Sequence, residues 1–248
     1  MSEKSINGIC LEICSNSIFS ALQAQEGGAS RVELCQNLEN GGTTPSYGQL
    51  QGARAQLSIG IHALIRPRGG NFLYNDSELE AMLADIRCCK EIGIDGVVIG
   101  ALNADGTLAI KQLEKMIDAA AGLHITFHRA FDRCLNPLVA MEQLIALGVS
   151  RILTSGQQEN AYAGKDLLKL LIENADQRIV IMPGAGVDAE NIASLLAYTG
   201  ARAIHSSAKM VQPSAMTFDQ PAISGMNEDT WYTSKEKVRQ LADILKNL

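Results

Sequence analysis

The sequence lacks any apolar run approaching the ~20 residues that a membrane-spanning helix needs, although 46% of its 248 residues are hydrophobic. It also lacks an apolar segment of the secretory type near its start, where residues 1–5 are polar. Aromatic residues are scarce, at 4% of the chain. These absences predict a soluble protein with a cytoplasmic location and no membrane partner.

Runs of basic residues and paired cysteines are missing as well. The 21 Lys and Arg residues are outnumbered by 27 Asp and Glu, which gives a net charge of −6 and argues against nucleic acid as a partner. The cysteines, at positions 10, 14, 35, 88, 89 and 134, form no CxxC pair, so neither a zinc ribbon nor a thioredoxin-like motif is indicated. In a reducing cytoplasm disulfides are not expected. The expected partner is therefore a small ligand or another protein.

Short apolar segments alternate with segments of helical periodicity along the chain. Gly28, Gly93, Gly148 and Gly200 each end a helical segment just before an apolar one, at separations of 52 to 65 residues. Such separations correspond to two strand–helix units of about thirty residues each. The pattern predicts a single-domain (β/α)8 TIM barrel over residues 1–248, with a doubly wound open sheet as the alternative. The expected strands are 9–13, 31–35, 59–65, 97–99, 124–127, 151–153, 179–182 and 203–205.

The last forty residues divide into two parts. Residues from about 208 to 230 contain Pro213, Pro221 and Gly225 and are expected to form a long loop. From about 234 to 247, apolar residues such as Val238 and Leu241 recur at helical spacing, which predicts a helix that completes the outer ring.

Polar residues recur near the ends of the expected strands, where barrels of this class place their working sites. The strand 59–65 runs into Arg66-Pro67-Arg68-Gly69-Gly70, so two guanidinium groups leave its end together. Because side chains alternate along a strand, one face of these strands is polar while the other is apolar. Buried charges are costly unless they are paired or liganded. The residues expected to face the barrel axis are Glu12, Cys14, Glu33, Cys35, His62, Arg66, Thr126 and His128.

This polar set has two interpretations. In the first, Glu12 and Glu33 only neutralise Arg66, Arg68 or Arg129 within a structural network. In the second, which we favour, the set binds a small anionic ligand. If the protein is an enzyme, the expected catalytic residues are Glu12, Glu33, Arg66 and His128, with the glutamates and the histidine exchanging protons.

Glycines and serines after the seventh and eighth strands stand where many such barrels hold phosphate. These residues either belong to an anion site or shape tight turns. With the arginines, the expected anion-binding residues are Arg66, Arg68, Arg129, Gly184, Gly186, Ser206 and Ser207.

Cys14 and Cys35 each lie two residues beyond a glutamate on neighbouring expected strands. Their thiolates could approach one another, and a pair of soft thiolates suits monovalent copper. The same spacing also fits two ordinary buried cysteines. His124 and His205 are expected to be structural residues.

The segments LEICSNS, RVELCQNLENGGTTPS, IRPRGGNFLYND, TFHRAFD, RILTSGQ and IMPGAGV resemble the CutC copper-homeostasis family over about residues 11–210. The resemblance implies a cytoplasmic TIM barrel, a homodimer, and a role in copper handling, with copper(I) as the only metal or cofactor. It also implies copper ligation by Cys14 and Cys35, which occupy the family's LE-x-C and E-L-C motifs. Two functions are therefore expected: copper homeostasis by thiolate binding at the barrel mouth, or an enzyme acting on a small anionic or phosphorylated metabolite.

Overall fold

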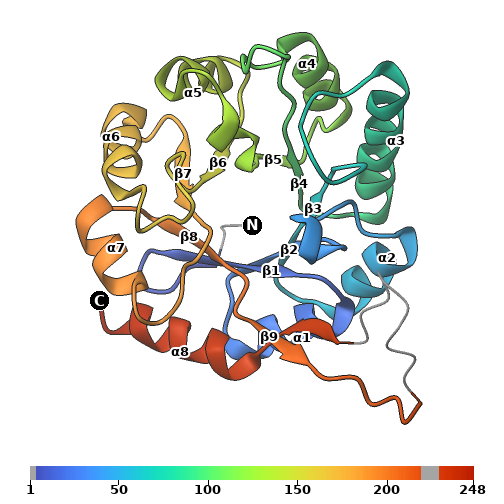
Figure 1. Cartoon of the computed structure of the whole chain (residues 1–248), viewed down its shortest axis with the longest axis vertical. Helices are drawn as coiled ribbons and strands as arrows, with labels where there is room; N and C mark the ends of the chain where they lie inside the picture. The colour runs from blue at the N-terminus through green and yellow to red at the C-terminus, as the bar shows by residue number, and fades with distance from the viewer. Residues whose placement is uncertain (1–3, 219–228) are drawn as a thin grey trace.

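A parallel eight-stranded sheet curls into a nearly closed barrel with the α-helices outside it (Figure 1). The computed structural model describes residues 4–218 and 229–248. The strands follow one another in the order β7-β6-β5-β4-β3-β2-β1-β8, so β1 pairs with both β2 and β8. The strands are β1 Cys10–Ser15, β2 Arg31–Leu34, β3 Gly60–Leu64, β4 Gly96–Ile99, β5 His124–Phe127, β6 Arg151–Thr154, β7 Val180–Pro183 and β8 Ala203–Ser206.

A helix follows each barrel strand, which confirms the predicted (β/α)8 barrel over the doubly wound alternative. Two short 3-10 helices, η1 Leu38–Asn40 and η2 Arg129–Arg133, lie in the loops after β2 and β5. The α-helices are α1 Ile18–Gly27, α2 Tyr47–Gln56, α3 Asp76–Ile92, α4 Ile110–Ala119, α5 Pro137–Ala146, α6 Lys165–Ala175, α7 Ile192–Thr199 and α8 Lys235–Lys246.

The recurring glycines act as C-caps. Gly28 closes α1 and Gly93 closes α3 with left-handed backbone angles, φ of 101° and 82°. Their N–H groups donate to carbonyls of the last helical turn. Because L residues with a side chain adopt this conformation at a cost, glycine is the favoured residue there, and the chain turns directly into the next strand.

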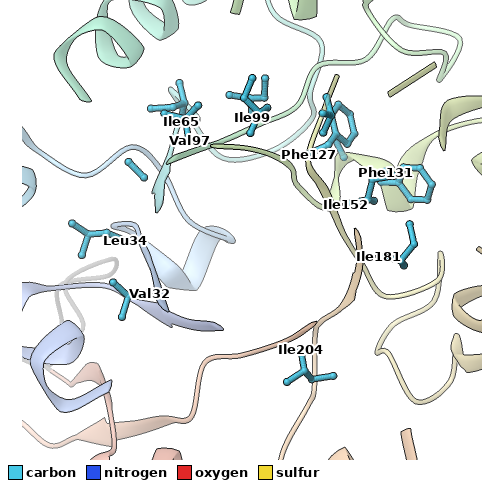
Figure 2. Close-up of a cluster of buried hydrophobic side chains, with 14 of the residues drawn as sticks. Val32, Leu34, Ile65, Val97, Ile99, Phe127, Phe131, Ile152, Ile181 and Ile204 are labelled. Carbon is cyan, nitrogen blue, oxygen red and sulfur yellow. The ribbon is translucent and has the colours of Figure 1, made fainter. Parts of the chain in front are cut away.

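Alternate strand residues pack outward against the helices and form the main core (Figure 2). This core takes Val32 and Leu34 from β2, Val97 and Ile99 from β4, and Phe127 from β5. The intervening positions face into the barrel, as the alternation predicts. That arrangement brings the polar members of the strands together along the barrel axis.

A small antiparallel hairpin follows β8 and differs from the sequence-based prediction. Residues 208–230 were expected as a loop, yet β9 (Lys209–Gln212) pairs with β10 (Thr230–Thr233), with Val211 opposite Trp231. Residues 219–228 lie outside the described part of the chain. β10 meets the end of β1, where Thr233 Oγ1 donates to the Cys14 carbonyl at 3.3 Å. No helix in the described residues is long and apolar enough to cross a membrane.

Candidate metal site and cavity

A cavity of about 310 Å³ opens at the carboxyl ends of the barrel strands. Cys14 from β1, Glu33 from β2 and His205 from β8 contribute to its lining. Loops after β2, β3, β5, β7 and β8 supply most of the rest, and a few residues come from strands. The lining also includes Leu38, Gly41, Leu64, Arg66, Phe72, His128, Arg129, Leu153, Ala185, Gly186, Val187, Ser206, Ser207 and Lys209.

Strand register brings together side chains that could hold a metal ion. Cys14 lies opposite Glu33 across the β1–β2 pairing, and Glu12 lies opposite His205 across β1–β8. Cys14 Sγ is 3.5 Å from Cys35 Sγ. One donor atom from each of Cys14, Glu33 and His205 falls within 4.8 Å of the others, and all three residues are buried. Cys14, Glu33 and His205 therefore form one group of donors, and the thiol of Cys35 adjoins that group through its contact with Cys14.

A chain of buried polar contacts orients the imidazole of His205. Its Nδ1 hydrogen-bonds to Glu12 Oε1 at 2.8 Å, while its Nε2 lies 3.8 Å from Glu33 Oε2. Glu12 in turn accepts from Arg31 Nε at 2.5 Å. A carboxylate that holds the far nitrogen of a histidine is a common support for metal-ligating imidazoles.

The charges in this series of buried polar contacts favour an ionised Glu12 beside a protonated His205. Burial opposes ionisation of Glu12, but the adjacent charge of Arg31 and the hydrogen bond to His205 hold the pKa of that carboxyl well below its ordinary value. Burial also opposes the charged imidazole, yet hydrogen bonds to Cys14 and Glu12 raise the pKa of His205 well above its ordinary value. Burial raises the pKa of Glu33.

The thiol of Cys14 is held in its protonated form. The hydrogen bond with Cys35, followed by burial, raises the pKa of Cys14 well above its ordinary value. A metal that takes this sulfur as a thiolate must therefore displace a proton, so metal affinity should depend on pH. The donor set fits a soft ion such as copper(I), and a two-sulfur, one-nitrogen, one-oxygen set also fits zinc.

Arg66 and Arg68 do not form a paired clamp over the cavity. Arg66 lines the cavity, but its terminal nitrogens donate to the carbonyls of Asn40, Gly42 and Gly70 at 2.8–3.0 Å. Within the described residues Arg68 is not part of the lining, and its Nε donates to Glu78 at 2.5 Å. Arg66 thus joins the loops after β2 and β3.

His128 and Arg129 both reach the cavity from the end of β5. Arg129 Nε pairs with Asp132 at 2.7 Å, and its side chain is 43% exposed. His128 is buried and accepts from the Ala130 N–H at Nδ1. Burial, together with the nearby charge of Arg66, lowers the pKa of His128 to about 3.

The residues expected to hold phosphate are only partly in the cavity. Gly186, Ser206 and Ser207 line it, whereas Gly184 packs so closely on Leu153 that a Cβ there would lie 2.4 Å from Leu153 Cδ1. The hydroxyl of Ser206 donates to the Val187 carbonyl at 2.6 Å and so helps to fix the loop. Elsewhere in the barrel, the ring of His62 stacks on that of His124.

His205 is the residue that the sequence reasoning missed, because it was expected to be structural. The signal was present in the alternation along residues 203–205, which gives His205 the same inward face that Glu12 has on β1. Phe72 and Lys209, which also line the cavity, were not singled out either. Phe72 comes from a loop, and Lys209 begins β9, in a segment where the sequence predicts a loop, so no strand periodicity marks either residue.

Comparisons with known proteins point to one family. The model of the CutC family matches residues 9–210. A CutC family protein from Parabacteroides distasonis is 47% identical over 236 residues, which cover 92% of this chain and 97% of the relative. The Homo sapiens copper homeostasis protein cutC homolog is 43% identical over 248 residues, covering 98% of this chain and 91% of the relative.

Solved structures agree with this assignment. A CutC structure from Streptococcus agalactiae superposes with a TM-score of 0.77 at 38% identity, covering 80% of this chain and 98% of that one. Thiamine phosphate pyrophosphorylase from Pyrococcus furiosus has a TM-score of 0.59 at 15% identity and covers 97% of each chain, which shows a shared fold alone.

Proposed function

The chain belongs to the CutC family, and from that premise we propose that it is a cytoplasmic copper-homeostasis protein that binds monovalent copper through Cys14 and Cys35. The observation that carries the proposal is the 3.5 Å separation of the two Sγ atoms beside an accessible cavity. Thiolate sulfur is the ligand type that copper(I) prefers over harder ions. Copper is the cargo of the site in this proposal.

His205 and Glu33 are the additional groups that would hold the ion. His205 Nε2 is the nitrogen left on the ring once Nδ1 is bound to Glu12, and it lies on the Glu33 side. Because the pKa of this ring is raised, Nε2 would release a proton when it binds the ion. A bound metal ion would neutralise the buried thiolates, and this would remove the free-energy cost of burying their negative charge in the barrel. Glu12 keeps the ring in place and does not itself contact the ion.

The test is anaerobic competition for copper(I) against a chromophoric chelator. Cys14→Ser and Cys35→Ser should each lower the affinity by more than the 10- to 100-fold that loss of an outer-shell contact typically costs. Cys88→Ser, on α3 and partly exposed, is the matched control and should leave the affinity unchanged. Equal affinities in all four proteins would refute thiolate binding.

His205→Asn separates a ligand from a packing residue. Asparagine can still hydrogen-bond to Glu12 but offers no imidazole Nε2, so copper(I) affinity should fall by at least about tenfold. Repeating the titration with zinc tests whether the site prefers zinc to copper(I), because zinc accepts the same four donors. Tighter binding of zinc than of copper(I) at equal pH would overturn copper as the preferred ion.

The cytoplasmic setting and the homodimer stay predictions. Cell fractionation tests the first. Light scattering of the purified protein tests the second, with twice the 26.6 kDa chain mass as the expected result.

A further inference from the structure

Two buried N–H groups, on residues that line the cavity, form no direct hydrogen bond within bonding distance among the residues that the structure describes. They are Arg66 Nε and His128 Nε2. Both residues line the 310 Å³ cavity, and both are at least nine-tenths buried. Buried donors almost always have a partner, so an unpaired donor calls for an explanation.

The role of His128 Nε2 follows from its other nitrogen. His128 Nδ1 accepts from the Ala130 N–H at 3.1 Å, so in the neutral ring the proton resides on Nε2. Burial, with the nearby charge of Arg66, lowers the pKa of His128 to about 3, which keeps the ring neutral at pH 7. Nε2 is therefore a donor at neutral pH and needs an acceptor.

Arg66 holds its Nε–H in a fixed position, on a guanidinium that also interacts with the buried hydroxyl of Tyr74. Its other nitrogens are already bound to three loop carbonyls, which hold the guanidinium still. The Arg66 Cζ atom lies 5.1 Å from the ring centre of Phe72, whose ring centre is 5.0 Å from that of His128. Phe72 thus connects the two donors within one wall of the cavity.

Charge and size define what could supply the acceptor. Arg66, Arg129 and Lys209 line the cavity, and Glu33 is the acidic side chain in its lining among the described residues. A volume of 310 Å³ is far larger than the roughly 30 Å³ of one water molecule, or than a single metal ion. We propose that the cavity binds a small organic oxyanion, a carboxylate or a phosphate ester, whose oxygens accept hydrogen bonds from Arg66 Nε and His128 Nε2.

This inference does not rest on copper binding. The donors come from the ends of β3 and β5, whereas Cys14 and Cys35 come from β1 and from the residue that follows β2. The experiment therefore uses the full chain freed of metal by a chelator that is then removed. A failure of copper binding would leave its result unchanged.

The experiment is isothermal titration with inorganic phosphate, acetate and phosphoglycolate, and with glycerol as the neutral control. At least one anion should bind with a Kd of about 1 mM or lower, so that its binding is nearly saturated at about 10 mM. Phosphate without acetate would assign a phosphate ester, and acetate without phosphate would assign a carboxylate. No saturable binding by any anion, or equal binding of glycerol, overturns the proposal.

His128→Asn is the matched variant. Its side-chain oxygen can still cap the Ala130 N–H, as asparagine does at helix N-termini, while the Nε2 donor is lost. The anion affinity should fall about tenfold or more, the usual scale for a hydrogen bond to a charged group. Lys165→Gln, on the outer helix α6, should leave it unchanged. Equal affinity in wild type and His128→Asn overturns the proposal.

A spectroscopic measurement gives an independent check. In a nitrogen–proton NMR spectrum of the histidine rings, the Nε2 resonance of His128, identified by its loss in His128→Asn, should move on saturation with the anion. A resonance that stays in place while the anion binds also overturns the proposal.

Discussion

Removing the charge of Glu12 should destabilise the protein far more than removing the charge of an exposed glutamate. Glu12 is fully buried and pairs with Arg31, whose side chain is 3% exposed, and also with His205. Glu12→Gln preserves the shape of the side chain but removes one carboxylate that neutralises the buried charge of Arg31. Breaking a buried ion pair from one side typically costs about 3–5 kcal/mol.

That loss of stability is measurable, and its size depends on pH. In a chain of this length about 1 kcal/mol corresponds to 2–4 °C in Tm, so a fall of roughly 6–20 °C is expected. Because the pKa of Glu12 is held below its ordinary value of 4.5, its stabilisation is present above that pH and is lost as the pH falls. The destabilisation by Glu12→Gln should therefore be full at pH 7 and shrink below pH 4.5.

The assay is urea unfolding followed by circular dichroism at pH 7 and at pH 4. The control is Glu142→Gln, which removes a bidentate partner of Arg178 at 2.7 Å, with both side chains about half exposed. An exposed pair contributes about 0–1 kcal/mol. If Glu12→Gln costs no more than Glu142→Gln at pH 7, the buried charge chain does not support the site as described.

Three other substitutions test the packing and the titration of the fold. In urea unfolding, His128 should make the wild type about 2 kcal/mol less stable at pH 5 than at pH 7, because the pKa of His128 is about 3 in the folded protein and higher in the unfolded chain. His128→Asn should lack this part of the pH dependence. If the stability difference between pH 5 and pH 7 is the same in His128→Asn as in wild type, the ring is not neutral as assigned. Gly27→Ala should lower Tm, because its Cβ would lie 2.6 Å from Val238 Cβ where α1 meets α8. Gly48→Ala, on α2 with nothing within 4 Å, should raise stability by up to about 1 kcal/mol, and the same loss at both glycines in thermal melts would contradict the close α1–α8 contact.

The barrel and the position of its working end could be predicted from the sequence because both depend on local patterns. The helix-ending glycines and the alternation of side chains placed Glu33 and Cys14 on inward-facing strand positions. The strand expected at 31–35 corresponds to β2, Arg31–Leu34. Predicting these features requires only the periodicity of residues along the sequence.

The features that escaped prediction depend on contacts between distant segments. His205 gains its role because barrel closure sets β8 beside β1, which puts it against Glu12 at a separation of 193 residues. Arg66 is held by loop carbonyls, whose positions follow from loop conformation and leave no periodic trace. The β9–β10 pairing brings Val211 opposite Trp231 across intervening residues that read as a loop.

X-ray absorption spectroscopy of the copper(I)-loaded protein tests the central claim most directly, because it reports the atoms bound to the metal. The account predicts two sulfur neighbours from Cys14 and Cys35 and a nitrogen neighbour that disappears in His205→Asn. A spectrum with only nitrogen and oxygen neighbours, or one unchanged in a protein that combines Cys14→Ser with Cys35→Ser, would contradict it.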